Sequence, residues 1–102
     1  KIQDSKYFLQ FERIQLENKV KAQQQEIISL KKQLNYTNSL VSDYDSMLKG
    51  EDRLFEIGES SLFVINSREN SLVSAQINNI AMENRLYTAI IGLYQSYGKP
   101  EL

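Results

Sequence analysis

The chain has 102 residues, a formal net charge of −1, and neither cysteine nor histidine. The near-neutral charge gives no electrostatic reason to expect a nucleic acid or an anionic membrane surface as a partner. The missing cysteines exclude disulfides and thiolate metal sites, and the missing histidines remove the commonest general base and metal ligand. No serine, lysine or aspartate stands in a recognisable catalytic pattern, so we expect no enzymatic activity, no cofactor and no metal.

A long helix is expected over about residues 3–56. Its apolar residues recur at an unbroken interval of seven, at Val20, Ile27, Leu34, Val41, Leu48 and Phe55. That interval is typical of a coiled-coil seam. The positions three residues further on are mostly polar: Gln23, Leu30, Thr37, Tyr44 and Glu51. Additional apolar residues widen this face toward the end of the helix, as expected for a helix that touches more than one neighbour: Leu40, Met47 and Leu54.

Two parts of this helix depart from the seam. Gly50 costs about 1 kcal/mol relative to alanine in a helix interior, and it predicts a bend or a close approach. Before Val20 the apolar residues leave the seven-residue interval, so the register of residues 1–20 stays open. This segment also outruns the second helix, and we expect something outside the hairpin to cover its apolar residues, Tyr7, Phe8, Phe11 and Ile14.

A tight turn is expected at residues 57–61. Gly58 can adopt the left-handed backbone conformation that closes a helix, and the next three residues carry oxygens that can cap the following one. Bulky apolar residues flank the turn on both sides, more than a solvated loop needs. We therefore interpret the tip as a candidate docking surface made of Phe55, Ile57, Gly58, Glu59, Ser60, Ser61 and Leu62.

Carboxylates are frequent around the end of the first helix, at Asp43, Asp45, Glu51, Asp52, Glu56 and Glu59. Paired carboxylates can bind a metal ion or do acid–base work. Helical spacing scatters these residues around the axis, which predicts a solvated face instead.

A second helix is expected over about residues 62–97. An apolar repeat at seven supports it, Val73, Ile80, Tyr87 and Tyr94, joined by Ile77 and Ile91 and interrupted by Asn84. Gly98, which precedes Lys99 and Pro100, should end the helix. Five tyrosines on or beside the apolar stripes are expected to bury the ring and keep the hydroxyl hydrated: Tyr36, Tyr44, Tyr87, Tyr94 and Tyr97. Residues 1–102 thus predict an all-α fold, a single long antiparallel coiled-coil hairpin that self-associates into a helical bundle.

The turn and the second helix resemble a known family. The run FEIGESSLFVINSRE at residues 55–69, then an Ala/Asn/Gln-rich helix, then YTAIIGLYQSYG at residues 87–98, is similar to the last periplasmic hairpin of TolC-like outer-membrane efflux proteins. The first half of the chain shares only a long, Gln- and Lys-rich helix with that family. One departure follows the tip, where some members carry aspartates that form an acidic ring and this chain has Val64 and Ser67. The resemblance therefore does not extend to a cation-binding constriction.

What the resemblance implies is a docking function. The chain would be a fragment of a homotrimeric export channel in the periplasm of a Gram-negative bacterium, soluble by itself, whose tip docks a periplasmic adaptor (membrane fusion) protein. Gly58 would be the tip glycine, with Ile57, Glu59, Ser60 and Ser61 as the adaptor-facing turn and Phe55 and Leu62 as apolar support. The isolated fragment would form a dimer or higher oligomer. The alternative is a generic coiled-coil oligomerisation or scaffold module, which has no need of an apolar cluster around Gly58.

Overall fold

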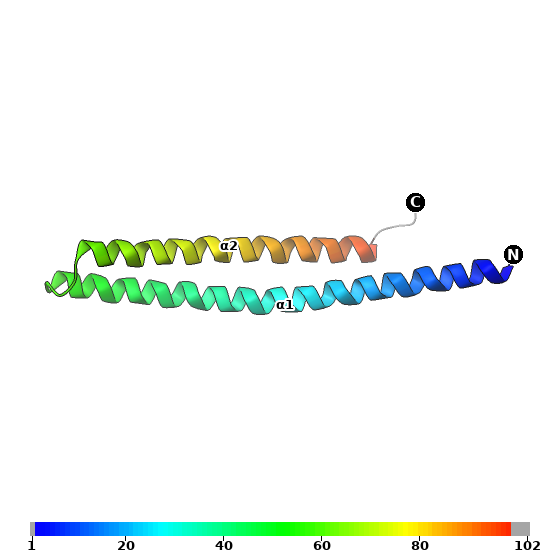
Figure 1. Ribbon diagram of the computed structural model, residues 1–102, viewed down its shortest axis with the longest axis horizontal. Helices are drawn as coiled ribbons and strands as arrows, with labels where there is room; N and C mark the ends of the chain where they lie inside the picture. The colour runs from blue at the N-terminus through cyan, green and yellow to red at the C-terminus, as the bar shows by residue number, and fades with distance from the viewer. Residues whose placement is uncertain (1, 99–102) are drawn as a thin grey trace.

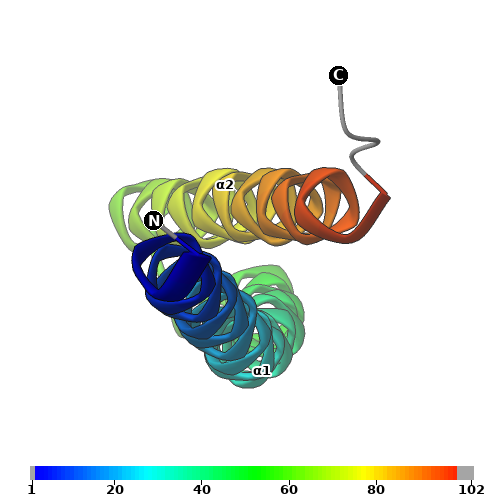
Figure 2. The same ribbon diagram turned by 90° about the vertical axis from the view of Figure 1, so that its right-hand side faces the viewer.

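The computed structural model describes residues 2–98 as two helices, α1 (Ile2–Glu56) and α2 (Leu62–Gly98). They lie side by side and antiparallel, joined by a tight turn (Figure 1), and the end-on view shows their axes inclined to one another (Figure 2). The molecule measures 84 × 20 × 16 Å. Its long dimension is the length of α1, because 55 residues at about 1.5 Å each span about 83 Å. The all-α helical hairpin predicted from the sequence is confirmed.

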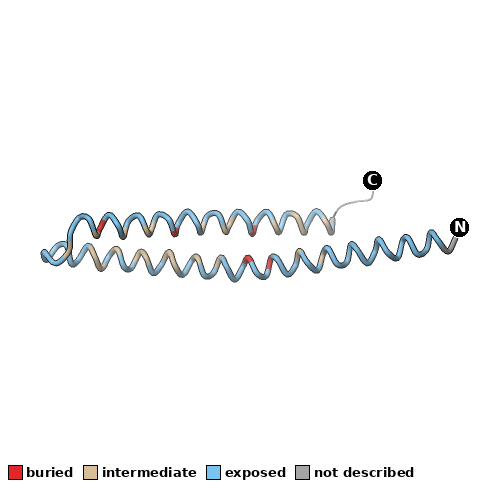
Figure 3. Tube along the Cα trace, in the orientation of Figure 1, coloured by how far each residue is buried: buried red, intermediate tan, exposed pale blue. Residues whose placement is uncertain are grey.

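The seam predicted on α1 faces α2 over most of its length. Ile27 and Leu30 are 8% and 7% exposed, and they pack with Leu86 of α2 in the central cluster of the hairpin. The other seam positions up to Leu48 are half-buried, whereas Phe55 is 42% exposed. Figure 3 shows the buried residues on the facing sides of the two helices. The contact surface is therefore one narrow stripe per helix and not a globular core.

The repeat noted on α2 does not face α1. Its members lie on the opposite side, with exposed fractions from 51% for Val73 to 77% for Tyr94. A different seven-residue repeat contacts α1 instead: Ile65, Leu72, Asn79, Leu86 and Leu93. Between these positions stand Ala75 and Ala89, whose small side chains allow the two helix axes to approach. The bulky isoleucines and tyrosines of the other repeat would hold α1 further away.

The expected burial of the tyrosine rings is wrong for four of the five. Tyr44 is half-buried, but Tyr36, Tyr87, Tyr94 and Tyr97 are 59% to 77% exposed. Tyr87 and Tyr94 belong to the repeat that faces away from α1, which leaves their rings exposed. Tyr97 lies at the edge of the contact surface, where its hydroxyl accepts a hydrogen bond from Gln24 Nε2 at 3.0 Å.

Two polar side chains of α1 in the contact surface are hydrogen-bonded to α2, although the buried Oε1 of Gln23 has no hydrogen-bond partner. The Thr37 hydroxyl donates to Asn79 Oδ1 at 2.7 Å, and Gln23 Nε2 donates to the Gly92 carbonyl oxygen at 3.5 Å. The Cβ that a side chain at Gly92 would add lies 3.9 Å from the same Gln23 nitrogen, an ordinary van der Waals distance, so an alanine would also fit beside the amide. These pairs explain why the mostly polar companion positions of α1 can face α2.

Gly50 marks no close approach. Helix α1 continues through it, and a Cβ added there would meet no atom within 4 Å. The expected close approach was wrong, because the space around the Gly50 Cα is open.

The first part of α1 lies outside the hairpin contact. Residues 4–19 are all exposed, among them Tyr7 at 65%, Phe8 at 60% and Phe11 at 57%. Within the part of the chain that the structure describes, α2 ends before it reaches them (Figure 1).

Candidate functional site

The turn closes α1 through a Schellman motif centred on Gly58. The Gly58 backbone has φ of 78°, in the left-handed region, and its N–H donates to the Phe55 carbonyl at 3.0 Å. The Glu59 N–H donates to the Leu54 carbonyl at 2.7 Å. These two bonds satisfy carbonyls that the helix end leaves free, and the positive φ explains why glycine stands at this position.

Helix α2 begins with a serine cap. Ser61 Oγ accepts a hydrogen bond from the Val64 N–H at 3.3 Å, and the Ser61 carbonyl accepts the first helical bond from Ile65 at 3.0 Å. A serine at this position satisfies one of the free N–H groups at the start of a helix. The chain thus reverses direction over residues 57–61, with hydrogen bonds holding both helix ends.

A polar cluster ties the turn to both helices. Ser60 Oγ donates to Glu51 Oε2 at 2.5 Å, and Arg68 Nε donates to Glu51 Oε1 at 3.4 Å. The Glu51 side chain is only 13% exposed, against 39% for Arg68. The carboxylate therefore links α1, the turn and α2, and it fixes the direction in which the tip points.

Sequence reasoning placed Glu51 on a solvated face and did not single out Arg68. The signal for Glu51 was present, because it occupies a companion position of the α1 seam, three residues after Leu48. A carboxylate on that side must face the partner helix, and a cation there is the expected counterpart. Arg68 stands at the matching place on α2, three residues after buried Ile65.

Bulky apolar side chains are exposed at the tip beside the exposed carboxylate residue Glu59. Ile57, Leu62 and Phe63 are 70%, 62% and 80% exposed, while Phe55 at 42% covers the base of the turn. Of the predicted residues, Ser60 is half-buried and points to Glu51, and Ser61 serves as the α2 cap. Phe63 was not among the predicted site residues, although it is the most exposed of the bulky apolar side chains in the described chain.

No family model, no curated protein and no solved structure matches this chain.

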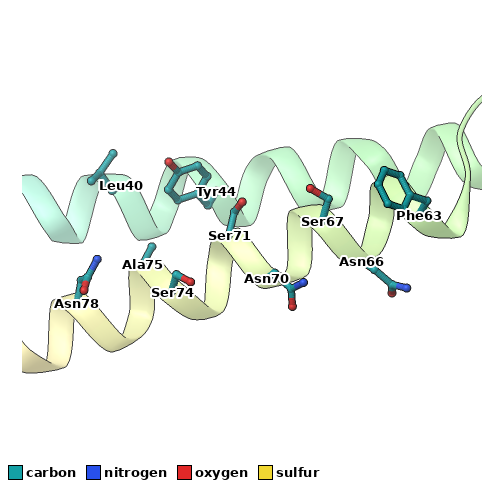
Figure 4. A pocket seen from close by; sticks show the side chains of 10 residues that line it. All are labelled: Leu40, Tyr44, Phe63, Asn66, Ser67, Asn70, Ser71, Ser74, Ala75 and Asn78. Atoms are coloured by element: carbon teal, nitrogen blue, oxygen red, sulfur yellow. The ribbon is translucent and has the colours of Figure 1, made fainter.

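An open groove runs along the helices next to the tip. It has a volume of about 560 Å³ and is lined mainly by hydroxyl and amide side chains of α2, with Leu40 and Tyr44 on α1 (Figure 4). Its lining holds no charged side chain. Such a shallow polar groove suits water or a neighbouring polar helix better than a small apolar ligand.

The acidic residues before the tip do not converge. Asp45 pairs with Lys49 of the same helix at 2.9 Å, and Glu51 faces α2. Among residues 2–98 no three side chains of the metal-binding types stand close enough to hold an ion together. Neither described helix has a stretch long and apolar enough to cross a bilayer.

The two glycines near the tip should respond oppositely to alanine. Gly58→Ala forces a Cβ into the left-handed region and should lower the free energy of unfolding by about 1–2 kcal/mol. Gly50→Ala meets no neighbour and should raise it by about 1 kcal/mol, because alanine is the better helix former. Urea unfolding followed by circular dichroism measures both; a stabilised Gly58→Ala would contradict the backbone geometry of the turn.

Proposed function

We propose that the tip is a docking surface, and that the chain is the hairpin of an export-channel subunit whose tip binds the hairpin of a periplasmic adaptor protein. The observation that carries the proposal is the exposed apolar tip on a rigidly hydrogen-bonded turn. Ile57, Leu62 and Phe63 are each more than 60% exposed, so the hairpin itself leaves most of their apolar surface uncovered. An apolar cluster at the end of a rod is typical of an interaction site.

Rigidity of the turn supports the same proposal. The Schellman bonds at Gly58 and the Glu51 cluster fix the tip in one conformation, so little conformational entropy would be lost on docking. The sequence of the turn and of α2 resembles TolC-like proteins, which use the corresponding tip in this way. The parent assembly, a homotrimer in the periplasm, is part of the proposal.

The test compares the same substitution at two exposed isoleucines, one at the tip and one far from it on α1. Ile57→Asp introduces a carboxylate at the apex of the tip, whereas Ile28→Asp places the same change on the exposed side of α1, far from the turn. Binding to the adaptor hairpin from the same organism is measured by calorimetry. We expect at least about a tenfold weaker affinity for Ile57→Asp, because docking would bury an unpaired charge. Unchanged affinity, or equal losses for both variants, would contradict tip docking.

A coiled-coil oligomerisation module is the second candidate function. The observation that favours it is the apolar repeat on the outward side of α2, which a tip-docking hairpin alone does not require. The two candidate surfaces share only Phe63, and Ile57 lies outside the α2 repeat. The Ile57→Asp variant therefore separates them, because it should weaken adaptor binding and leave self-association intact.

A further inference from the structure

The outward side of α2 carries a second complete heptad repeat, here called the outer seam. Its members are Phe63, Asn66, Asn70, Val73, Ile77, Ile80, Asn84, Tyr87, Ile91 and Tyr94. They follow one another in alternating steps of three and four residues, the a and d positions of a coiled coil. All of them are exposed, Phe63 at 80% and Tyr94 at 77%. The repeat spans residues 63–94, more than the three to four heptads that indicate a coiled coil.

The outer seam lies nearly opposite the face that packs on α1. Every second member, beginning with Phe63, precedes a member of the α1-facing repeat by two residues, as Phe63 precedes Ile65. Two residues turn an α-helix by about 200°, which leaves the two faces about 160° apart. A helix that is apolar on two opposite sides is typical of one packed between two neighbours. Helix α1 is the first neighbour, and the second is missing from the single hairpin.

The charges around the outer seam fit a second copy of the same helix. The seam itself contains no charged residue. On its flank Glu69 and Glu83 occupy g positions, which in a parallel pair of helices face the e positions of the following heptad. Those e positions are Ser74 and Thr88, so two identical helices meet without like-charge contacts.

The polar residues of the outer seam select one arrangement of two copies. Asn70 and Asn84 both fall at a positions, two heptads apart. In a parallel, in-register pair each amide faces its own counterpart, which offers both a donor and an acceptor. A shift by one heptad would place Asn84 against isoleucine. An antiparallel pair would place it against Ile80 or Tyr87, and the antiparallel register that brings it to Asn66 leaves residues 88–94 of the seam without a partner. Buried asparagines at a positions fix register in this way.

We propose that the outer seam of α2 binds a second copy of this chain, parallel and in register, with Asn84 facing Asn84. The two α2 helices would form the centre of a four-helix layer with α1 on each flank, and both tips would point in the same direction. The surface shares only Phe63 with the tip, and Ile77, Asn84 and Ile91 lie further along α2, so the proposal holds whether or not the tip docks an adaptor.

Sedimentation equilibrium of the 102-residue chain tests the surface. We expect a species of twice the 11.8 kDa chain mass. Ile77→Lys should raise the dissociation constant at least about 100-fold, because each copy would bring a cation into the seam. The matched control is Ile28→Lys, an isoleucine with 55% exposure on α1 compared with 61% for Ile77. A monomeric native chain, or a dimer that survives Ile77→Lys, would overturn the proposal.

Disulfide trapping tests whether the two α2 helices are parallel. The chain has no cysteine of its own, so only an introduced cysteine can form a cross-link. Ile91→Cys places two sulfurs opposite one another in the parallel pair, within the distance that a disulfide needs. In each of the antiparallel arrangements the two positions 91 lie at least about 16 Å apart. We expect rapid disulfide-linked dimers from Ile91→Cys and none from Ile28→Cys. A dimer that does not cross-link at position 91, or equal cross-linking at both positions, would overturn the parallel register.

Discussion

Ile27→Ala is expected to lower the free energy of unfolding by about 2–4 kcal/mol, a large part of what a two-helix hairpin can have. Ile27 is 8% exposed and packs against the cluster that includes Leu30 and Leu86. Truncation removes buried methyl groups and leaves a gap between two rigid helices that cannot close without moving the whole contact surface. Urea unfolding monitored by helical circular dichroism gives the value.

The adjacent residue supplies the control. Ile28 is the same residue type on the same turn of α1, but it is 55% exposed. Ile28→Ala should change the free energy of unfolding by less than about 0.5 kcal/mol, as is usual for exposed positions. Losses of similar size at positions 27 and 28 would show that the register of α1 against α2 is wrong.

Glu51→Ala should cost about 1–2 kcal/mol of stability and should loosen the tip. The substitution removes the acceptor for Ser60 and for Arg68 and leaves both donors without the carboxylate that joins them. The estimate stays modest because Arg68 is 39% exposed and water can solvate it. Unfolding in urea measures the stability, and amide hydrogen exchange of residues 57–61 measures the loosening.

Asp52 is the matched control for Glu51. It is the neighbouring carboxylate on α1, but it is exposed. Asp52→Ala should change the free energy of unfolding by less than about 0.5 kcal/mol. It should leave the amide hydrogen exchange of residues 57–61 unchanged. If the two variants behave alike, the Ser60–Glu51–Arg68 cluster does not hold the tip.

Much of the fold follows from the sequence because heptad spacing is a strong signal. The α1 seam from Val20 to Leu48 was predicted in the correct register, and a turn at Gly58 follows from its special backbone. The face of α2 could not be chosen in the same way. It carries two apolar repeats, one through Ile65 and one through Phe63, and both satisfy the heptad rule. Packing chose the one that presents small residues such as Ala75 to α1.

The candidate site was predictable in outline but not in its internal contacts. The position of the turn and its apolar flanks depend on residues that are adjacent in the sequence, so the sequence alone predicts them. The pairing of Glu51 with Ser60 and Arg68 joins residues 9 and 17 positions apart across a reversal of the chain. Which carboxylate of an acidic segment faces the second helix depends on the exact phase of both helices, and that phase comes only from packing.

Because α1 is longer than α2, the hairpin has a stiff two-helix part and a more flexible single-helix part. Helix α1 has 55 residues and α2 has 37, so about 27 Å of α1 continues as a single helix. Two packed helices resist bending far more than one does, and a single exposed helix of this length is only marginally stable alone. Under a sideways force on the tip, the two-helix part would therefore stay nearly straight as far as the Gln24–Tyr97 contact. The single helix just beyond that contact would bend. The boundary of the paired region acts as a built-in joint, set by where α2 stops.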